Sequence, residues 1–227
     1  MRAVRAAPAG GGLPMDFTVL RVPFFLEPDY PTGAEFEETN RARLLRKWGG
    51  AAGWAAQKAR HDLKGRGRAV GIARFDLDRI ASSTRLSHRV VQFVTRTAGV
   101  NAAERLYADL NRLHFEEGRK LNDAPMLVAA AARAGADGDA VAACVADPDA
   151  GAAEIAAAGD LLRDLGVSGI PTMILGGRWR LPSGALHAED LVAAFRGVEA
   201  NGGATGAAFA DALNIPARVM EETLDLA

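Results

Sequence analysis

The 227-residue sequence has a formal net charge of −1 and 49% hydrophobic residues, enough apolar content to bury one good core. This near-neutral charge gives no overall electrostatic case for binding nucleic acid or an anionic membrane surface. A single cysteine excludes a disulfide scaffold, and the apolar run 126–132 is too short to span a bilayer.

The chain begins with a basic segment that contains no helix or strand pattern. We expect residues 1–14 to be disordered and the protein to be cytoplasmic, with organellar targeting as the alternative for a short segment free of acidic residues. The middle of the chain, about residues 34–160, reads as helices throughout, and glycine pairs or prolines end several of them. The predicted helices are Glu35–Trp48, Trp54–Lys64, Leu77–Ala98, Ala102–Glu117, Asp123–Ala134 and Asp137–Ala146.

The C-terminal half changes to a mixed pattern around a proline. Pro171 has no N–H to donate and belongs at the first position of a strand, here Met173–Leu175. Gly176-Gly177 predicts a hairpin turn into a second strand, Arg178–Leu181. A helix that ends at Gly166 precedes this hairpin, and a helix over His187–Val198 follows it.

The last residues give the weakest pattern in the chain. Gly202-Gly203 is typical of a linker, and short helices are predicted over Ala207–Leu213 and Ala217–Leu226. We treat residues 199–227 as a C-terminal helical tail, which either docks on the domain or frays.

Four short motifs give this pattern a family resemblance. The segments Gly169–Thr172 and Pro182–Ala185 resemble signatures of DsbA-like thioredoxin-fold oxidoreductases. The segments Val22–Asp29 and Ser82–Arg89 are similar to those of the FrnE-like branch, the first of them lying on its second strand. Relatives of that branch include 2-hydroxychromene-2-carboxylate isomerases and kappa-type glutathione transferases.

The resemblance implies an α/β thioredoxin-like fold with a large all-helical insertion, the DsbA architecture. The domain would cover residues 15–198 and the insertion about residues 34–160, although the helical pattern by itself also permits an independent helical domain. In the family a first strand and helix carry the redox motif, and this chain has only residues 1–14 in that place. We therefore expect an N-terminally incomplete fold, through either a shortened gene model or a natural loss of the catalytic element.

Thiol–disulfide exchange is the function that the resemblance implies, with a thiol or disulfide protein or a small molecule as substrate. It places Ile170, Pro171 and Thr172 in the substrate-binding site. A cis bond at Ile170-Pro171 would present the N–H and C=O of Ile170 to an extended peptide by strand addition. His88 lies in a family-like segment and would face a small-molecule pocket, unless it is a helix-surface or capping residue.

The chain departs from the family because it contains no Cys-x-x-Cys motif. Its one cysteine, Cys144, lies within an alanine-rich helical stretch and is expected to be a buried structural residue, so no catalytic residue is assigned. One thiol cannot close an intramolecular disulfide, and dithiol chemistry needs a second cysteine to resolve the mixed disulfide. The enzyme class therefore stays undecided between an oxidoreductase by family and a protein without dithiol activity.

Two alternatives remain open at this point: a non-catalytic peptide-binding module, and a glutathione-dependent isomerase or transferase. No cofactor is expected, except glutathione under the second alternative. No metal site is expected, because none of the four histidines lies four residues from another. Homodimerisation is expected if the missing strand leaves an exposed sheet edge. A basic run with glycines is interpreted as a solvated linker, with phosphate binding as the alternative; it consists of Lys58, Arg60, His61, Lys64, Arg66 and Arg68.

Overall fold

A computed structural model describes residues 15–76, 78–203 and 206–225 of the chain. The prediction of a disordered segment at residues 1–14 therefore lies outside the described residues. The chain divides into two compact units. The first unit combines Met1–Leu26, Gln92–Ala103 and Asp147–Ala227, and the second combines Glu27–Val91 with Glu104–Ala146.

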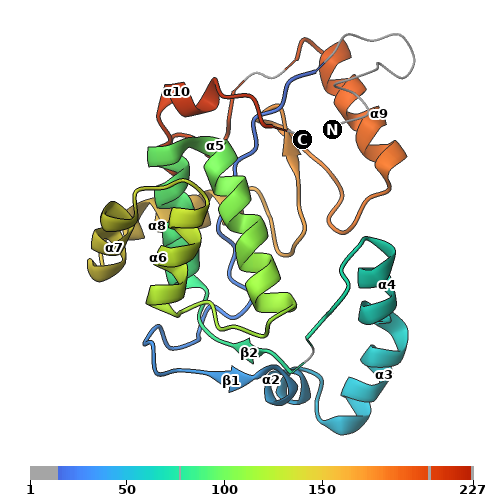
Figure 1. The fold of residues 1–227 in the computed structure, drawn as a ribbon. Helices are drawn as coiled ribbons and strands as arrows, with labels where there is room; N and C mark the ends of the chain where they lie inside the picture. The colour runs from blue at the N-terminus through green and yellow to red at the C-terminus, as the bar shows by residue number, and fades with distance from the viewer. Residues whose placement is uncertain (1–14, 77, 204–205, 226–227) are drawn as a thin grey trace. The chain divides into compact units, whose positions relative to one another are not determined.

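The first unit contains the hairpin that the sequence predicts. Strands β3 (Ile174–Leu175) and β4 (Trp179–Arg180) pair antiparallel, with Ile174 opposite Arg180 and Leu175 opposite Trp179 (Figure 1). The turn glycines, Gly176 and Gly177, both have positive φ angles, which favour glycine over residues with a side chain. Helix α8 (Ala152–Asp164) precedes the hairpin, α9 (Ala188–Ala200) follows it, and the short α10 (Ala217–Met220) lies near the C-terminus.

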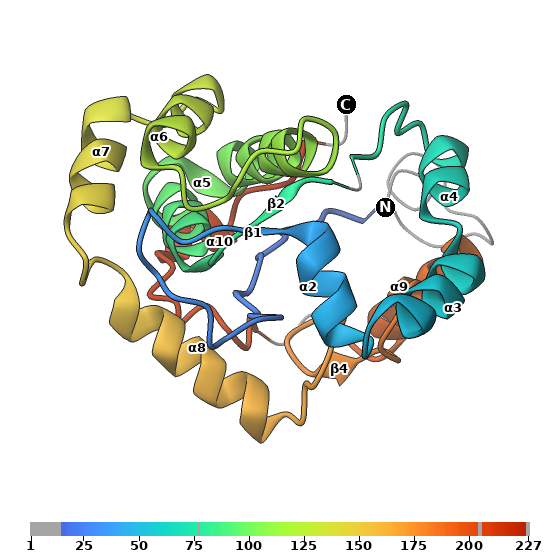
Figure 2. The same cartoon turned by 90° about the horizontal axis from the view of Figure 1, so that it is seen from below.

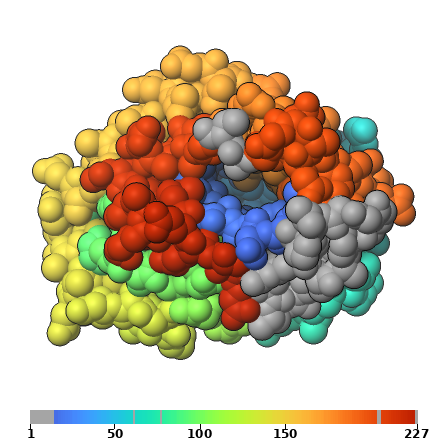
Figure 3. All heavy atoms as spheres, turned by 90° about the horizontal axis from the view of Figure 1, so that it is seen from above, coloured from blue at the N-terminus to red at the C-terminus, as the bar shows by residue number. Residues whose placement is uncertain are grey.

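An extended segment, residues 16–25, also belongs to the first unit. Leu20, Val22 and Phe24 alternate along it and pack against the unit's buried core. The segment is extended but is not assigned as a strand, because no β-ladder pairs with it within the described residues. Its start lies beside the C-terminal residues, where the Leu224 N–H donates to the Phe17 carbonyl (2.7 Å; blue and red in Figure 3).

The core of the first unit is built from three separate stretches of sequence. Its members are buried apolar side chains from α5, α8 and the C-terminal residues: Val100, Ala158, Leu162, Phe209, Leu213, Ile215 and Val219. The C-terminal stretch is thus part of the core rather than a frayed tail. The prediction of a helix at Ala207–Leu213 is wrong, because this stretch consists of turns. Individual apolar side chains of these turns are buried in the core.

The second unit is mainly helical. Its helices are α2 (Asn40–Lys47), α3 (Ala51–His61), α4 (Leu63–Ala69), α6 (Ala124–Arg133) and α7 (Gly138–Ala146). Helices α6 and α7 pack against each other (Figure 2). Asp123 accepts the Met126 N–H as the N-cap of α6, so the sequence placed this helix start correctly.

The predicted insertion is not all helical, and this is a correction. Strands β1 (Glu38–Thr39) and β2 (Ile80–Ala81) form an antiparallel pair in the second unit. Two-residue strands leave no alternating pattern in the sequence, so the helix predicted at Leu77–Ala98 extended too far towards the N-terminus. Helix α5 begins at Arg85 and ends at Phe115, with non-helical backbone angles at Gly99. None of the described helices is both long and apolar enough to cross a membrane.

Candidate functional site

The predicted substrate-binding loop is Gly169–Thr172 of the first unit, and side-chain and main-chain hydrogen bonds hold its shape. The Ile170–Pro171 peptide bond is cis. The Thr172 hydroxyl donates to the Gly169 carbonyl at 2.8 Å and lies 2.8 Å from the Ser183 hydroxyl. The Gly184 N–H donates to the Pro171 carbonyl at 2.8 Å. The loop is therefore fixed to the segment that leads into α9.

Ile170 projects from this fixed loop into solvent. It exposes 51% of its surface, which is high for a large apolar side chain. Neither its N–H nor its carbonyl has a hydrogen-bond partner in the part of the chain that the structure describes. An apolar side chain and unpaired main-chain groups at one point can receive an extended peptide, since strand addition uses both.

Cys144 lies on helix α7 of the second unit, whereas the loop belongs to the first unit. The residue is 6% exposed and its carbonyl accepts a hydrogen bond from Arg89 Nη2 at 2.8 Å. Since it is the only cysteine of the 227 residues, it forms no disulfide within the chain. Cys144 is in the last turn of α7, away from the helix N-terminus where the reactive thiols of redox proteins commonly lie.

His88 belongs to the second unit, whereas Ile170, Pro171 and Thr172 belong to the first. It lies in the first turn of α5 and is half-buried, and its N–H donates to the Thr84 carbonyl. Ile170, Pro171 and Thr172, which are adjacent in the sequence, therefore lie in one unit, and His88 lies in the other.

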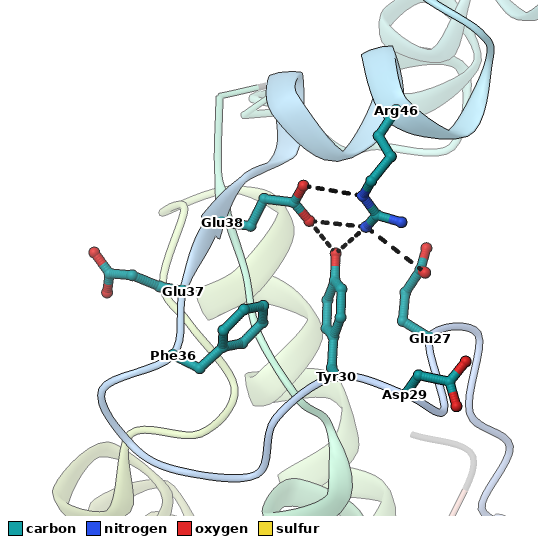
Figure 4. Close-up of a pocket in the computed structure, with 7 residues that line it drawn as sticks. All are labelled: Glu27, Asp29, Tyr30, Phe36, Glu37, Glu38 and Arg46. Atoms are coloured by element: carbon teal, nitrogen blue, oxygen red, sulfur yellow. Dashed lines mark hydrogen bonds and ion pairs between the residues drawn. The ribbon is translucent and has the colours of Figure 1, made fainter.

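Sequence reasoning missed a pocket in the second unit, which we call the Tyr30 pocket. It has a volume of about 430 Å³, and its wall comes from the loop after residue 26, from β1 and from α2. Charged and aromatic side chains line it: Glu27, Asp29, Tyr30, Phe36, Glu37, Glu38 and Arg46 (Figure 4). The family-like segment Val22–Asp29 contributes two of these residues, and this was the only signal for the pocket in the sequence.

A hydrogen-bonded triad occupies the centre of the Tyr30 pocket. Arg46 Nη2 donates to Glu38 Oε2 (3.0 Å) and to the Tyr30 hydroxyl (3.2 Å), and that hydroxyl donates to Glu38 (Figure 4). Burial, and then the Glu38 hydrogen bond, raise the pKa of Tyr30 to about 12. Hydrogen bonding to Arg46 lowers the pKa of Glu38. Tyr30 therefore stays protonated near neutral pH, and its hydroxyl joins the loop to β1 as a donor and to α2 as an acceptor.

A second polar contact that the sequence did not reveal joins His114 and Arg79. Arg79 Nε donates to His114 Nε2 (3.1 Å), so the ring proton lies on Nδ1, which donates to the Arg119 carbonyl (2.8 Å). Burial lowers the pKa of His114 to about 4, and neighbouring guanidinium groups add to this effect. Both ring nitrogens are engaged in a neutral imidazole. No group of three or more metal-binding side chains occurs within the described residues.

Comparison with known families identifies the family of this chain. The model of the DSBA-like thioredoxin domain matches residues 56–196, which is more than half of the chain. The chain belongs to the DsbA-like thioredoxin domain family. The matched range includes the Gly169–Thr172 loop, the β3–β4 hairpin and helices α5 to α8.

A solved structure supports the same DsbA assignment. The probable DsbA oxidoreductase of Streptomyces coelicolor is 29% identical to the chain and superposes with a TM-score of 0.67. The match covers 81% of this chain and 75% of that one. A search of curated proteins finds no match. The thioredoxin-like fold with a large helical insertion, predicted from the sequence, is thereby confirmed.

Proposed function

We propose that this DsbA-family chain binds an extended thiol- or disulfide-containing polypeptide at the Gly169–Thr172 loop and has no dithiol turnover of its own. The observation that carries this proposal is Ile170, half-exposed on a hydrogen-bonded loop with its main-chain N–H and C=O unpaired within the described residues. A fixed loop loses little conformational entropy when a peptide pairs with it, so the loop favours binding.

The absence of turnover follows from the chemistry of thiol exchange. Attack of one thiolate on a disulfide forms a mixed disulfide, and a second thiol must then displace the product. The 227-residue chain contains only Cys144, which is buried in α7. This chain therefore cannot complete the two-thiol cycle on its own. Substrate recognition is the part of the family's function that the loop supports.

Within the family we propose the FrnE-like branch and a cytoplasmic location. The branch rests on the segments Val22–Asp29 and Ser82–Arg89, and the second of these leads into α5. The location rests on a cysteine content that offers no disulfide scaffold of the kind found in oxidising compartments. Fractionation of cells that produce the tagged protein tests the location.

The binding experiment uses reduced insulin B chain, an extended polypeptide whose cysteines are alkylated so that only non-covalent binding is measured, labelled with fluorescein for anisotropy. We expect saturable binding that Ile170→Glu weakens about tenfold, which corresponds to a loss of roughly 1.4 kcal/mol in binding free energy. Leu165→Glu is the matched control, because Leu165 is also apolar, in the same unit and 39% exposed. The control should bind like the unaltered chain.

Three results would contradict the proposal. Equal loss of binding in both variants would show non-specific apolar contact rather than a site at the loop. Reduction of insulin disulfides by the chain, with turnover that survives Cys144→Ser, would show a redox centre other than a protein thiol. Saturable binding of glutathione that competes with the B chain would replace the peptide with a small thiol as ligand, as in a glutathione-dependent isomerase or transferase.

A further inference from the structure

A second pocket in the second unit, which we call the basic pocket, lies between helix α4 and the segment that follows it. Its volume is about 360 Å³. The side chains that matter for its chemistry come from α4 (Lys64 and Arg68) and from the following segment (Arg74, Phe75, Asp76 and Asp78). The peptide-binding proposal uses none of these residues.

A glycine allows the two walls of the basic pocket to lie close together. Gly67 is buried in α4, and its carbonyl accepts the Ile72 N–H at 2.9 Å, which turns the chain back along the helix. A Cβ atom at position 67 would lie only 3.3 Å from the ring of Phe75. The following segment thus packs directly on the bare backbone of α4, and the pocket is a defined feature of the fold.

The charges on the two walls of the basic pocket are unequal. Asp76 lies 3.7 Å from Arg74 and Asp78 lies 3.4 Å from Arg41, so both carboxylates of the pocket have a cationic neighbour. Lys64 and Arg68 form no ion pair with any other residue that the structure describes. They lie four residues apart on α4 and therefore on the same side of the helix.

We propose that the basic pocket binds the phosphate group of a small hydroxylated phosphate ester. Two adjacent uncompensated cations suit a dianion, and both ammonium and guanidinium groups bind phosphate, the guanidinium by paired N–H donors. A pocket of this size accommodates a small molecule. Asp76 and Asp78 can accept hydrogen bonds from hydroxyl groups, and their negative charge opposes the close approach of a second phosphate.

The test measures binding of glycerol 3-phosphate to the full chain by calorimetry, with glycerol and inorganic phosphate as comparison ligands. We expect saturable binding of the ester, weaker binding of inorganic phosphate and none of glycerol. The double variant Lys64→Gln/Arg68→Gln should weaken binding of the ester at least about tenfold, the effect of losing two charge-assisted contacts.

A matched control separates the basic pocket from the general basic surface. Arg60→Gln/Arg66→Gln removes the same charge from α3 and α4, at exposed residues that do not line the pocket. This control should keep the affinity within about twofold, which is the size of a screened surface effect. Equal weakening in both double variants would overturn the proposal, as would the absence of saturation at about 10 mM ester.

A second measurement uses the unaltered chain, so no substitution can disturb the fold. Acetylation of lysines, followed by mass spectrometry, should show protection of Lys64 but not of Lys58 when glycerol 3-phosphate is present. Equal protection of both lysines would contradict a defined pocket. Tighter binding of a DNA oligonucleotide than of the ester, lost equally in both double variants, would show a polyanion surface instead. Failure at this pocket leaves peptide binding at Gly169–Thr172 unaffected, since the two experiments share no residue.

Discussion

His114 is the residue whose protonation should most change the stability of the second unit. Its pKa is about 4 in the folded chain and about 6.5 in an unfolded one, so acidification protonates the unfolded state first. The stability that it contributes is complete above pH 6.5 and is lost as the pH falls towards 4. We expect the free energy of unfolding to decrease by about 1.5 kcal/mol between pH 6.5 and pH 5 for this reason.

Urea denaturation at several pH values measures this effect, and His114→Gln is the comparison. Glutamine does not titrate, so the variant should be less stable at pH 7 but should show a flatter pH profile between 6.5 and 5. The two profiles should therefore converge as the pH falls. Parallel profiles would show that another group causes the acid sensitivity.

Tyr30 is predicted to stabilise the second unit through its hydroxyl group. Tyr30→Phe removes the hydrogen bonds to Glu38 and Arg46 but keeps the ring beside Phe36, whose centroid is 4.9 Å away. We expect a loss of about 1 kcal/mol in the free energy of unfolding. In a double-mutant cycle with Glu38→Ala the two losses should not add, because both substitutions break the same contact. Additive losses would argue that the hydroxyl acts elsewhere.

At the residue scale, the sequence predicted features that depend on neighbouring residues in the chain. The buried setting of Cys144 was predictable because its alanine-rich neighbours in the chain define a helix with a small apolar residue on it. Tyr30 and Arg46 are 16 positions apart, and His114 meets Arg79 across 35 positions. Such contacts depend on the tertiary fold and leave no periodic signal in one sequence.

At the element scale, α5 shows how a helix break depends on distant residues. Gly99 has a φ angle of 89°, and the Val100 N–H that follows it donates to the carboxylate of Glu222 (3.0 Å). The glycine was predicted to end a helix, and the backbone does leave the helical conformation there. The carboxylate that caps the next helical stretch comes from the C-terminal residues and could not be predicted from the sequence.

Glu222→Ala should therefore destabilise the first unit by about 1–2 kcal/mol, the usual effect of losing an N-terminal cap. Glu221→Ala is the control, since this neighbouring carboxylate is exposed and should change stability by less than about 0.5 kcal/mol. Thermal unfolding by circular dichroism compares the two variants. Similar midpoints for both variants would contradict a capping role for Glu222.

Helix positions were predictable where capping and periodicity agree, as in α6, which was expected at Asp123–Ala134 and is observed at Ala124–Arg133. They were not predictable where apolar side chains are buried without a regular helix. The C-terminal residues 206–216 have no regular helix, yet Phe209, Leu213 and Ile215 are buried. Their alanine-rich sequence favours a helix, and the packing of three apolar side chains overrides that preference.

At the scale of the whole molecule, residues far apart in sequence complete the thioredoxin-like part of the chain. The core of the first unit takes side chains from α5, from α8 and from the C-terminal stretch, and the extended segment 16–25 packs against it. Family membership predicted the central elements of this fold. It did not predict that residues 206–225 would contribute so much of the core, since the family match ends at residue 196.

Leu213→Ala tests whether the C-terminal stretch is part of this fold. Leu213 is fully buried in the first unit, so the substitution should lower the free energy of unfolding by about 3 kcal/mol through lost burial and a cavity. Leu26→Ala makes the same change in the same unit at a residue that is 52% exposed, and should cost less than about 1 kcal/mol. Hydrogen exchange locates the effect: amides of residues 92–103 and 147–203 should lose protection, with peptides from 104–146 as the internal reference. Equal effects of the two substitutions would mean that the C-terminal residues rest on the unit without stabilising it.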